Sequence, residues 1–155
     1  MISPEIIRRY TFFTGLTAKQ YRSLAMLAEK ENLEIGSTIF EEGQSANKFF
    51  ILVEGNVELY IKSEEFDQPS TRRDFFVGEI NPGDVFGISA VLEPYTYTAT
   101  AKAANTISVI EFDALSLRDL MQENCKFGFH LMHQIAKALL FRLNASRIQL
   151  AAAWD

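Results

Sequence analysis

The stretch that decides the fold is residues 86–103, which read Phe86-Gly87-Ile88-Ser89-Ala90-Val91-Leu92-Glu93-Pro94-Tyr95-Thr96-Tyr97-Thr98-Ala99-Thr100-Ala101-Lys102-Ala103. A glycine precedes a short apolar helical turn, a proline ends the turn, and a strand of small residues follows. This order is typical of a compact anion cradle, because glycine lets the backbone approach a ligand and a helix N-terminus offers unpaired N–H groups. The stretch holds no arginine, and it has no carboxylate where a tight phosphate-sugar site would want one.

The composition indicates a globular protein and argues against several partners. The chain has 155 residues, 48% of them hydrophobic, which is enough for a sizeable core. Its formal net charge of −5 argues against non-specific binding to nucleic acid or an anionic membrane, because phosphates are held mainly by Lys and Arg. The single cysteine, Cys125, allows no intramolecular disulfide. No signal peptide opens the sequence and no apolar run is long enough to span a membrane, so we expect a cytoplasmic location.

We expect a single domain over residues 1–155, with three parts. N-terminal helices occupy residues 1–30, because Ser3-Pro4 starts one helix to about Tyr10 and a capping box at Thr17–Gln20 opens another that ends near Lys30. The apolar period then changes to two, and the part from 33 to 112 is predicted to be an antiparallel β roll that contains the cassette 86–103. Its strands are predicted over 35–40, 48–53, 57–61, 72–80, 97–101 and 106–112. The last part, 113–155, is predicted to hold one helix over 114–122 and a longer one over 127–153. The fold class is therefore mainly β with flanking helices.

Four motifs along the chain are shared with a known family. They are Phe13-x-Gly15-Leu16-Thr17, Ile39-Phe40-x-x-Gly43, Phe50-Ile51-Leu52-x-x-Gly55-x-Val57 and Pro82-Gly83-Asp84-x-Phe86-Gly87. With them, the chain resembles the cyclic-nucleotide-binding domain of catabolite-activator-type regulators, cyclic-nucleotide-dependent kinase regulatory subunits and gated channels. The resemblance covers nearly the whole chain and implies a jelly-roll-like double-stranded β-helix with N-terminal helices and a long C-terminal helix.

The cassette departs from the family pattern at the two residues that hold the ligand. The family reads Phe-Gly-Glu-x-Ala-Leu and later Arg-x-Ala-Thr, and this chain aligns with both without a gap. The glutamate that would hold the ribose 2′-hydroxyl is Ile88 here, and the arginine that would pair with the cyclic phosphate is Tyr97. The resemblance implies a ligand site made by Phe86, Gly87, Ile88, Ser89, Ala90, Tyr97, Thr98 and Ala99.

These two departures predict weak or no binding of ordinary cyclic AMP and cyclic GMP. A guanidinium offers phosphate a charged fork of donors, whereas a phenol offers one neutral donor. Loss of a buried charge-assisted contact costs about 2–5 kcal/mol, which is about one and a half to four decades of affinity. The cradle itself is retained in Gly87, in the amides of residues 88–90 and in the hydroxyls of Ser89 and Thr98.

Two interpretations of Ile88 and Tyr97 stay open. They fill a disused pocket with apolar and aromatic bulk, or they line a pocket repurposed for a different, less acidic ligand. Arg72 and Arg73 offer a cation from an unusual direction, although a solvated strand end is the simpler interpretation.

The sequence predicts no catalytic residues, metal or cofactor. His130 and His133 lie three apart near Cys125, but no third ligand has suitable spacing. A cupin-like enzyme, the main enzyme alternative, would carry metal-binding histidines on its strands, and the predicted strands have none.

The long C-terminal helix carries apolar residues on one face: Met132, Ile135, Ala136, Leu139 and Leu143, continuing toward Ile148 and Leu150. At about 40 Å this helix is longer than a small β roll can cover. In the family this helix often forms a two-helix seam, so we expect a homodimer with a short coiled-coil-like contact.

The resemblance favours a regulatory, ligand-sensing module, because in the family the ligand shifts the helices that follow the cassette. In this chain the shifted helix would be the one from Phe127 onward. The alternative is a ligand-free dimerisation or protein-interaction module. The expected partners are a small-molecule or cyclic-nucleotide-like ligand, a second copy of the chain and an effector protein. We expect no membrane partner, and no direct contact with nucleic acid because no helix-turn-helix follows the last helix in this sequence.

Overall fold

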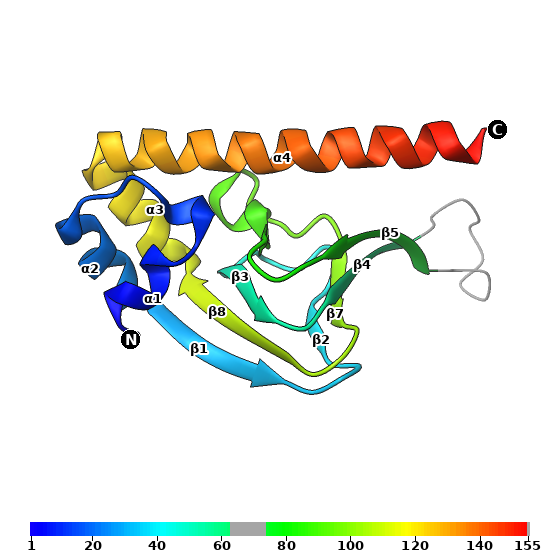
Figure 1. Cartoon of the computed structure of the whole chain (residues 1–155), viewed down its shortest axis with the longest axis horizontal. Helices are drawn as coiled ribbons and strands as arrows, with labels where there is room; N and C mark the ends of the chain where they lie inside the picture. Colours follow the sequence, from blue (N-terminus) through cyan, green and yellow to red (C-terminus); the bar gives the residue numbers. More distant parts are fainter. Residues whose placement is uncertain (63–73, 155) are drawn as a thin grey trace.

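Two antiparallel sheets of four strands each form the centre of the computed structural model, which describes residues 1–62 and 74–154 (Figure 1). One sheet has the strand order β1-β8-β3-β6 and the other has the order β2-β7-β4-β5. With helices on either side in sequence and a long last helix, this arrangement confirms the expected β roll. Arg72 and Arg73, and the predicted start of a strand there, lie outside the described residues.

Apart from two strands that were not predicted, over 28–33 and 85–86, the elements follow the order expected from the sequence. They are α1 (Pro4–Arg8), η1 (Thr11–Phe13), α2 (Ala18–Met26), β1 (Ala28–Leu33), β2 (Thr38–Phe40), β3 (Lys48–Glu54), β4 (Val57–Lys62), β5 (Asp74–Ile80), β6 (Val85–Phe86), η3 (Ile88–Val91), β7 (Thr100–Ala103), β8 (Ile107–Asp113), α3 (Ala114–Glu123) and α4 (Cys125–Ala153).

The core lies inside the roll and beneath the N-terminal helices. In β8, six of seven residues are buried, because one face of the strand meets the other sheet and the opposite face meets the helices. The ring of Phe112 on β8 lies 5.4 Å from that of Phe13, and Phe49 on β3 lies 5.9 Å from Phe12. These aromatic contacts fasten η1 to the sheet.

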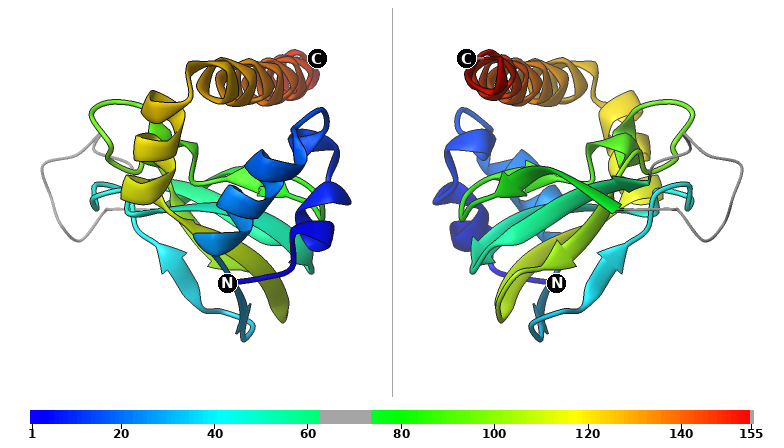
Figure 2. Two further views of the ribbon diagram at one scale, coloured as in Figure 1. Left: turned by 90° about the vertical axis from the view of Figure 1, so that its left-hand side faces the viewer. Right: turned by 90° about the vertical axis from the view of Figure 1, so that its right-hand side faces the viewer.

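Helix α4 forms a separate layer along the length of the molecule (Figures 1 and 2). It begins at an N-cap, since the side chain of Asn124 accepts a hydrogen bond from the amide of Phe127 at 3.1 Å. A Cβ atom on Gly128 would lie 2.5 Å from the carbonyl oxygen of Met121, so this glycine lets α4 start close against α3. The start of α4 is therefore fixed by packing, and the rest of the helix extends over the roll.

The predicted boundaries were wrong at three places. The strand predicted over 35–40 is shorter, since β2 covers only Thr38–Phe40. The second helix ends at Met26 rather than near Lys30, and residues 28–33 form strand β1, paired with β8. Four of the six residues of this strand are polar and exposed, as is common for a sheet edge, so it has no apolar alternation to reveal it. Strand β7 begins at Thr100 rather than at Tyr97, because the amide of Tyr97 donates to the carbonyl of Gln44 at 2.9 Å in a separate loop contact.

Candidate functional site

The candidate site is the cassette between β6 and β7, whose backbone turns sharply at Gly87. This residue has a φ of +67°, in the left-handed region that favours glycine. A Cβ atom there would lie 2.9 Å from Cδ2 of Phe50 and 3.1 Å from the carbonyl oxygen of Lys48. Gly87 is therefore needed both for its conformation and for the close approach of the cassette to β3.

Gly87→Ala is expected to destabilise the protein more than Gly83→Ala. Both glycines have positive φ, but a Cβ atom on Gly83 would meet nothing within 4 Å. The left-handed conformation costs either variant about 1–2 kcal/mol, and crowding against Phe50 adds about 1–3 kcal/mol for Gly87→Ala alone. Urea denaturation of the two variants measures the difference. Equal losses in the free energy of unfolding would show that the close approach to β3 is unimportant.

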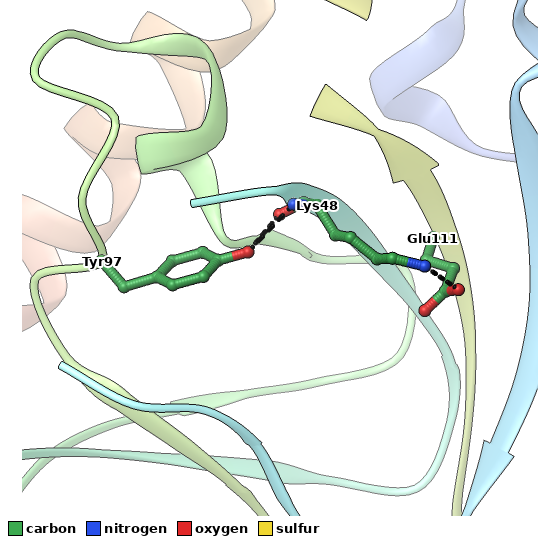
Figure 3. Close-up of polar contacts among 3 residues, drawn as sticks. All are labelled: Lys48, Tyr97 and Glu111. Carbon is green, nitrogen blue, oxygen red and sulfur yellow. Dashed lines mark hydrogen bonds and ion pairs between the residues drawn. The ribbon is translucent and has the colours of Figure 1, made fainter. Parts of the chain in front are cut away.

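The side chain of Tyr97 is built into the wall of the site. Its hydroxyl donates to the backbone carbonyl of Lys48 at 2.7 Å and accepts from the amide of the same residue at 3.1 Å (Figure 3). Its ring stacks on Phe40 with 3.8 Å between the ring centroids, and only 5% of the residue is exposed. Burial raises the pKa of this phenol, so it stays neutral at physiological pH. Tyr97 therefore stabilises the fold where the family arginine would contact a ligand.

The neighbourhood of Tyr97 includes a partly buried ion pair. The ammonium group of Lys48 lies 2.5 Å from a carboxylate oxygen of Glu111 on β8 (Figure 3). The hydrogen bond to Glu111 raises the pKa of Lys48. Because this cation is already paired, it does not replace the missing arginine.

Ile88 and Tyr97 are buried, but they leave a cavity of about 330 Å³ beside them. Of the eight residues predicted for the site, seven line it: Phe86, Gly87, Ile88, Ser89, Tyr97, Thr98 and Ala99. Ala90 does not line it and is completely buried. The volume is at the lower end of the range typical of small-molecule sites.

The backbone of Ala90 does not belong to the cradle. Its amide donates to the carbonyl of Gly87 at 3.1 Å, and its carbonyl accepts from Nε of Arg118 at 2.8 Å. The guanidinium of Arg118 also lies 3.9 Å from the ring centroid of Tyr95. The expectation that the amides of residues 88–90 all face a ligand was therefore wrong for Ala90, and Arg118 on α3 holds this turn in place.

Helix α4 supplies the other wall of the cavity, which was not predicted from the sequence. Leu139 and Arg142 line it from this helix, opposite the cassette. They are three residues apart and therefore lie on neighbouring positions of the helix surface. The cassette motif does not predict that these residues line the cavity. One signal in the sequence could have placed Arg142 on the side of α4 that faces the roll. Arg142 shares the helical period of Leu131 and Ile135, which are buried.

Arg142 is a half-buried cation on the inner face of α4. Within residues 1–62 and 74–154, its guanidinium makes no hydrogen bond or ion pair. Burial lowers its pKa, and the negative charge of Asp84 opposes that effect. The Asp84 carboxylate accepts a hydrogen bond from the amide of Asn81 at 3.0 Å, which holds it in its own turn.

The described residues contain no group of three or more His, Cys, Asp and Glu side chains that could hold a metal ion. His130 contacts the carbonyl oxygen of Thr14 through Nε2 at 2.7 Å, and Cys125 is exposed. Among the helices of the described part, none is both long and apolar enough to cross a membrane.

Comparison with known proteins identifies the family. A family model described as the cyclic nucleotide-binding domain matches residues 30–124. A solved structure of a candidate cyclic nucleotide-binding protein from Geobacter metallireducens GS-15 is 36% identical, with a TM-score of 0.81, and the match covers 92% of this chain and 99% of that one. The chain belongs to the cyclic nucleotide-binding domain family.

Two relatives with lower identity are named as regulators. The chain is 21% identical over 135 residues to a CRP-like cAMP-activated global transcriptional regulator of Mycobacterium tuberculosis, a match that covers 87% of this chain and 58% of that protein. It is 26% identical over 109 residues to a cAMP-dependent protein kinase regulatory subunit of Dictyostelium discoideum, covering 70% of this chain and 32% of that protein. The chain thus spans less than two thirds of the length of these relatives.

Proposed function

We propose that the protein is a ligand-sensing regulatory domain whose cassette binds ordinary cyclic AMP and cyclic GMP weakly or not at all. One observation carries this proposal: a cavity of about 330 Å³ persists in the cassette, although Ile88 and Tyr97 stand where the family has glutamate and arginine. Tyr97 has both of its hydroxyl contacts committed to Lys48, so it has little to offer a phosphate. The open cavity favours a repurposed site over a filled one.

Titration calorimetry of the wild-type protein tests this proposal. We expect no heat of binding for cyclic AMP or cyclic GMP at micromolar concentrations, because the charged grip on the phosphate is lost. A dissociation constant in the micromolar range or tighter for either nucleotide would contradict the proposal.

The regulatory output would be helix α4, through which we propose that two copies of the chain associate. The helix has two opposite faces. Phe127, Leu131 and Ile135 are buried against the domain, and Ala138 and Arg142 continue this inner face. The opposite face carries exposed residues at alternating spacings of three and four: Phe129, His133, Ala136, Leu140, Leu143, Arg147, Leu150 and Trp154.

This outer stripe has the 3.5-residue repeat of a two-helix coiled coil. Leu140 is 56% exposed, Leu143 47% and Leu150 61%, so a large apolar surface lacks a partner within the described residues. A repeat with this period fits a second long helix, and a second copy of α4 supplies one. His133 and Arg147 are polar members of the stripe and would fix the register of the two helices.

The predicted dimer residues divide between the two faces. Ala136 and Leu143 belong to the outer stripe and remain in the proposed seam. Ile135 is only 1% exposed and packs inside its own domain, so it cannot contact a partner. Met132 is half-buried against the core, and Leu139 lines the cassette cavity.

A ligand-free dimerisation or protein-interaction module is the second candidate function, and the outer stripe of α4 favours it equally. The two candidates differ in whether a ligand in the cavity changes stability or association. A non-enzymatic role, an effector-protein partner and a cytoplasmic location stay predictions.

A further inference from the structure

We propose that Arg142 on α4 replaces the missing cassette arginine, so that the cavity takes a small organic phosphate held between α4 and the cassette. This inference rests on the proposed ligand-sensing function and names the class of ligand. The sequence favoured a less acidic ligand because the cassette lacks its arginine. A cation supplied by α4 instead favours an acidic ligand.

Arg142 lies where its guanidinium can reach a ligand in the cassette cavity. Its side chain lines the same cavity as Gly87, Ser89 and Thr98, from the opposite wall. A guanidinium offers several donors in a planar fork, which matches the geometry of phosphate oxygens. The hydroxyls of Ser89 and Thr98 add neutral donors across the cavity.

The guanidinium of Arg142 is a charged group that lacks a partner of opposite charge among the described residues. It is half-buried and keeps its charge at any physiological pH. A charge removed from water is costly unless it is paired, and no described residue pairs with this one. Asp84 is the acidic neighbour on the inner side, but it makes no ion pair with Arg142 and its carboxylate is engaged by Asn81. An anionic ligand would supply the missing partner.

The other residues that line the cavity indicate the polarity of the part of the ligand that carries the phosphate. Leu59, Leu92 and Leu139 make part of the wall apolar, which suits the body of an organic molecule. Ile88 replaces the residue that would hold a sugar hydroxyl, so the site has no charged acceptor in its interior for such a group. Glu93 also lines the cavity, but this residue is exposed to solvent.

A ligand held in this way would join α4 to the cassette. Arg142 belongs to the inner face of the helix and Leu139 lines the cavity beside it, whereas the outer face carries the stripe proposed for dimerisation. Binding would therefore favour the arrangement in which α4 lies against the cassette, and the populations of two helix arrangements would shift.

The test uses NMR of the ¹⁵N-labelled full chain with three probes: cyclic AMP, inorganic phosphate and adenosine, each to about 10 mM so that weak binding is detected. We expect cyclic AMP to shift the Nε–H signal of Arg142 and the amide signals of Gly87 and Ser89. Inorganic phosphate should shift the Arg142 signal with lower affinity, and adenosine should leave it unchanged because it has no negative charge.

Arg142→Gln should weaken cyclic AMP binding by about tenfold or more. The affinity of Arg142→Lys should lie between those of the wild type and Arg142→Gln. Lys126→Gln is the matched control, since it removes one positive charge from an exposed site at the start of the same helix. Equal cyclic AMP affinity in wild type and Arg142→Gln would overturn the role of Arg142 while leaving the ligand-sensing function in place. If no phosphate-bearing probe perturbs the cassette, the phosphate site is overturned, and the ligand-sensing function would then need the less acidic ligand expected from the sequence.

Discussion

Replacing both Leu140 and Leu143 with glutamate is expected to convert the proposed dimer to a monomer. Both side chains belong to the outer stripe of α4 and are 56% and 47% exposed in the single chain. Full burial of an exposed leucine contributes about 1.5–3 kcal/mol, so burying the exposed half of each contributes about 1 kcal/mol, and a two-fold interface buries two copies of each. The double variant also places like charges at the seam, so the dissociation constant of the dimer should rise by several orders of magnitude.

Sedimentation velocity over a range of protein concentrations measures this change. Ile148→Glu is the matched control, because Ile148 is 71% exposed on the same helix but lies outside the stripe. We expect it to sediment as the wild type does. Circular dichroism should show that all variants keep the wild-type fold. A wild-type protein that stays monomeric at high concentration would refute the seam altogether.

The double variant Ile88→Glu/Tyr97→Arg is expected to gain affinity for cyclic AMP, by about thirtyfold to several thousandfold. It restores the sugar acceptor and the charged phosphate donor, and the phosphate contact alone is worth about 2–5 kcal/mol. Titration calorimetry against the wild type measures the gain. A folded double variant without any gain would mean that the cassette, beyond these two side chains, cannot receive a nucleotide.

The same variant is expected to be less stable than the wild type. Tyr97 contributes a ring stacked on Phe40 at 3.8 Å and two hydrogen bonds to the backbone of Lys48. Their loss should lower the free energy of unfolding by about 2–4 kcal/mol. Tyr97→Phe separates the two contributions, because it keeps the ring and removes only the hydroxyl.

Several features could be predicted because they depend on neighbours in the chain. The turn at Gly87 could be predicted because a left-handed backbone favours glycine. The capping box at Thr17 could be predicted because its two side chains are three residues apart. Strand β1 could not be predicted in the same way, because its charged residues pair with distant β8 and carry no period of their own.

The sequence by itself determined the family, the β roll and the loss of the two ligand-holding side chains in the cassette, since each of these is written in short motifs or in local spacing. Only the tertiary structure decided that Tyr97 is bonded to Lys48, that the cavity remains open, and that Arg142 lines it from α4. The physical reason is that a cavity and its charges are assembled from segments far apart in the chain. The position of each segment is fixed by packing, as for α4 at Gly128 and Ile135, and packing leaves no local pattern beside the residues that it brings together.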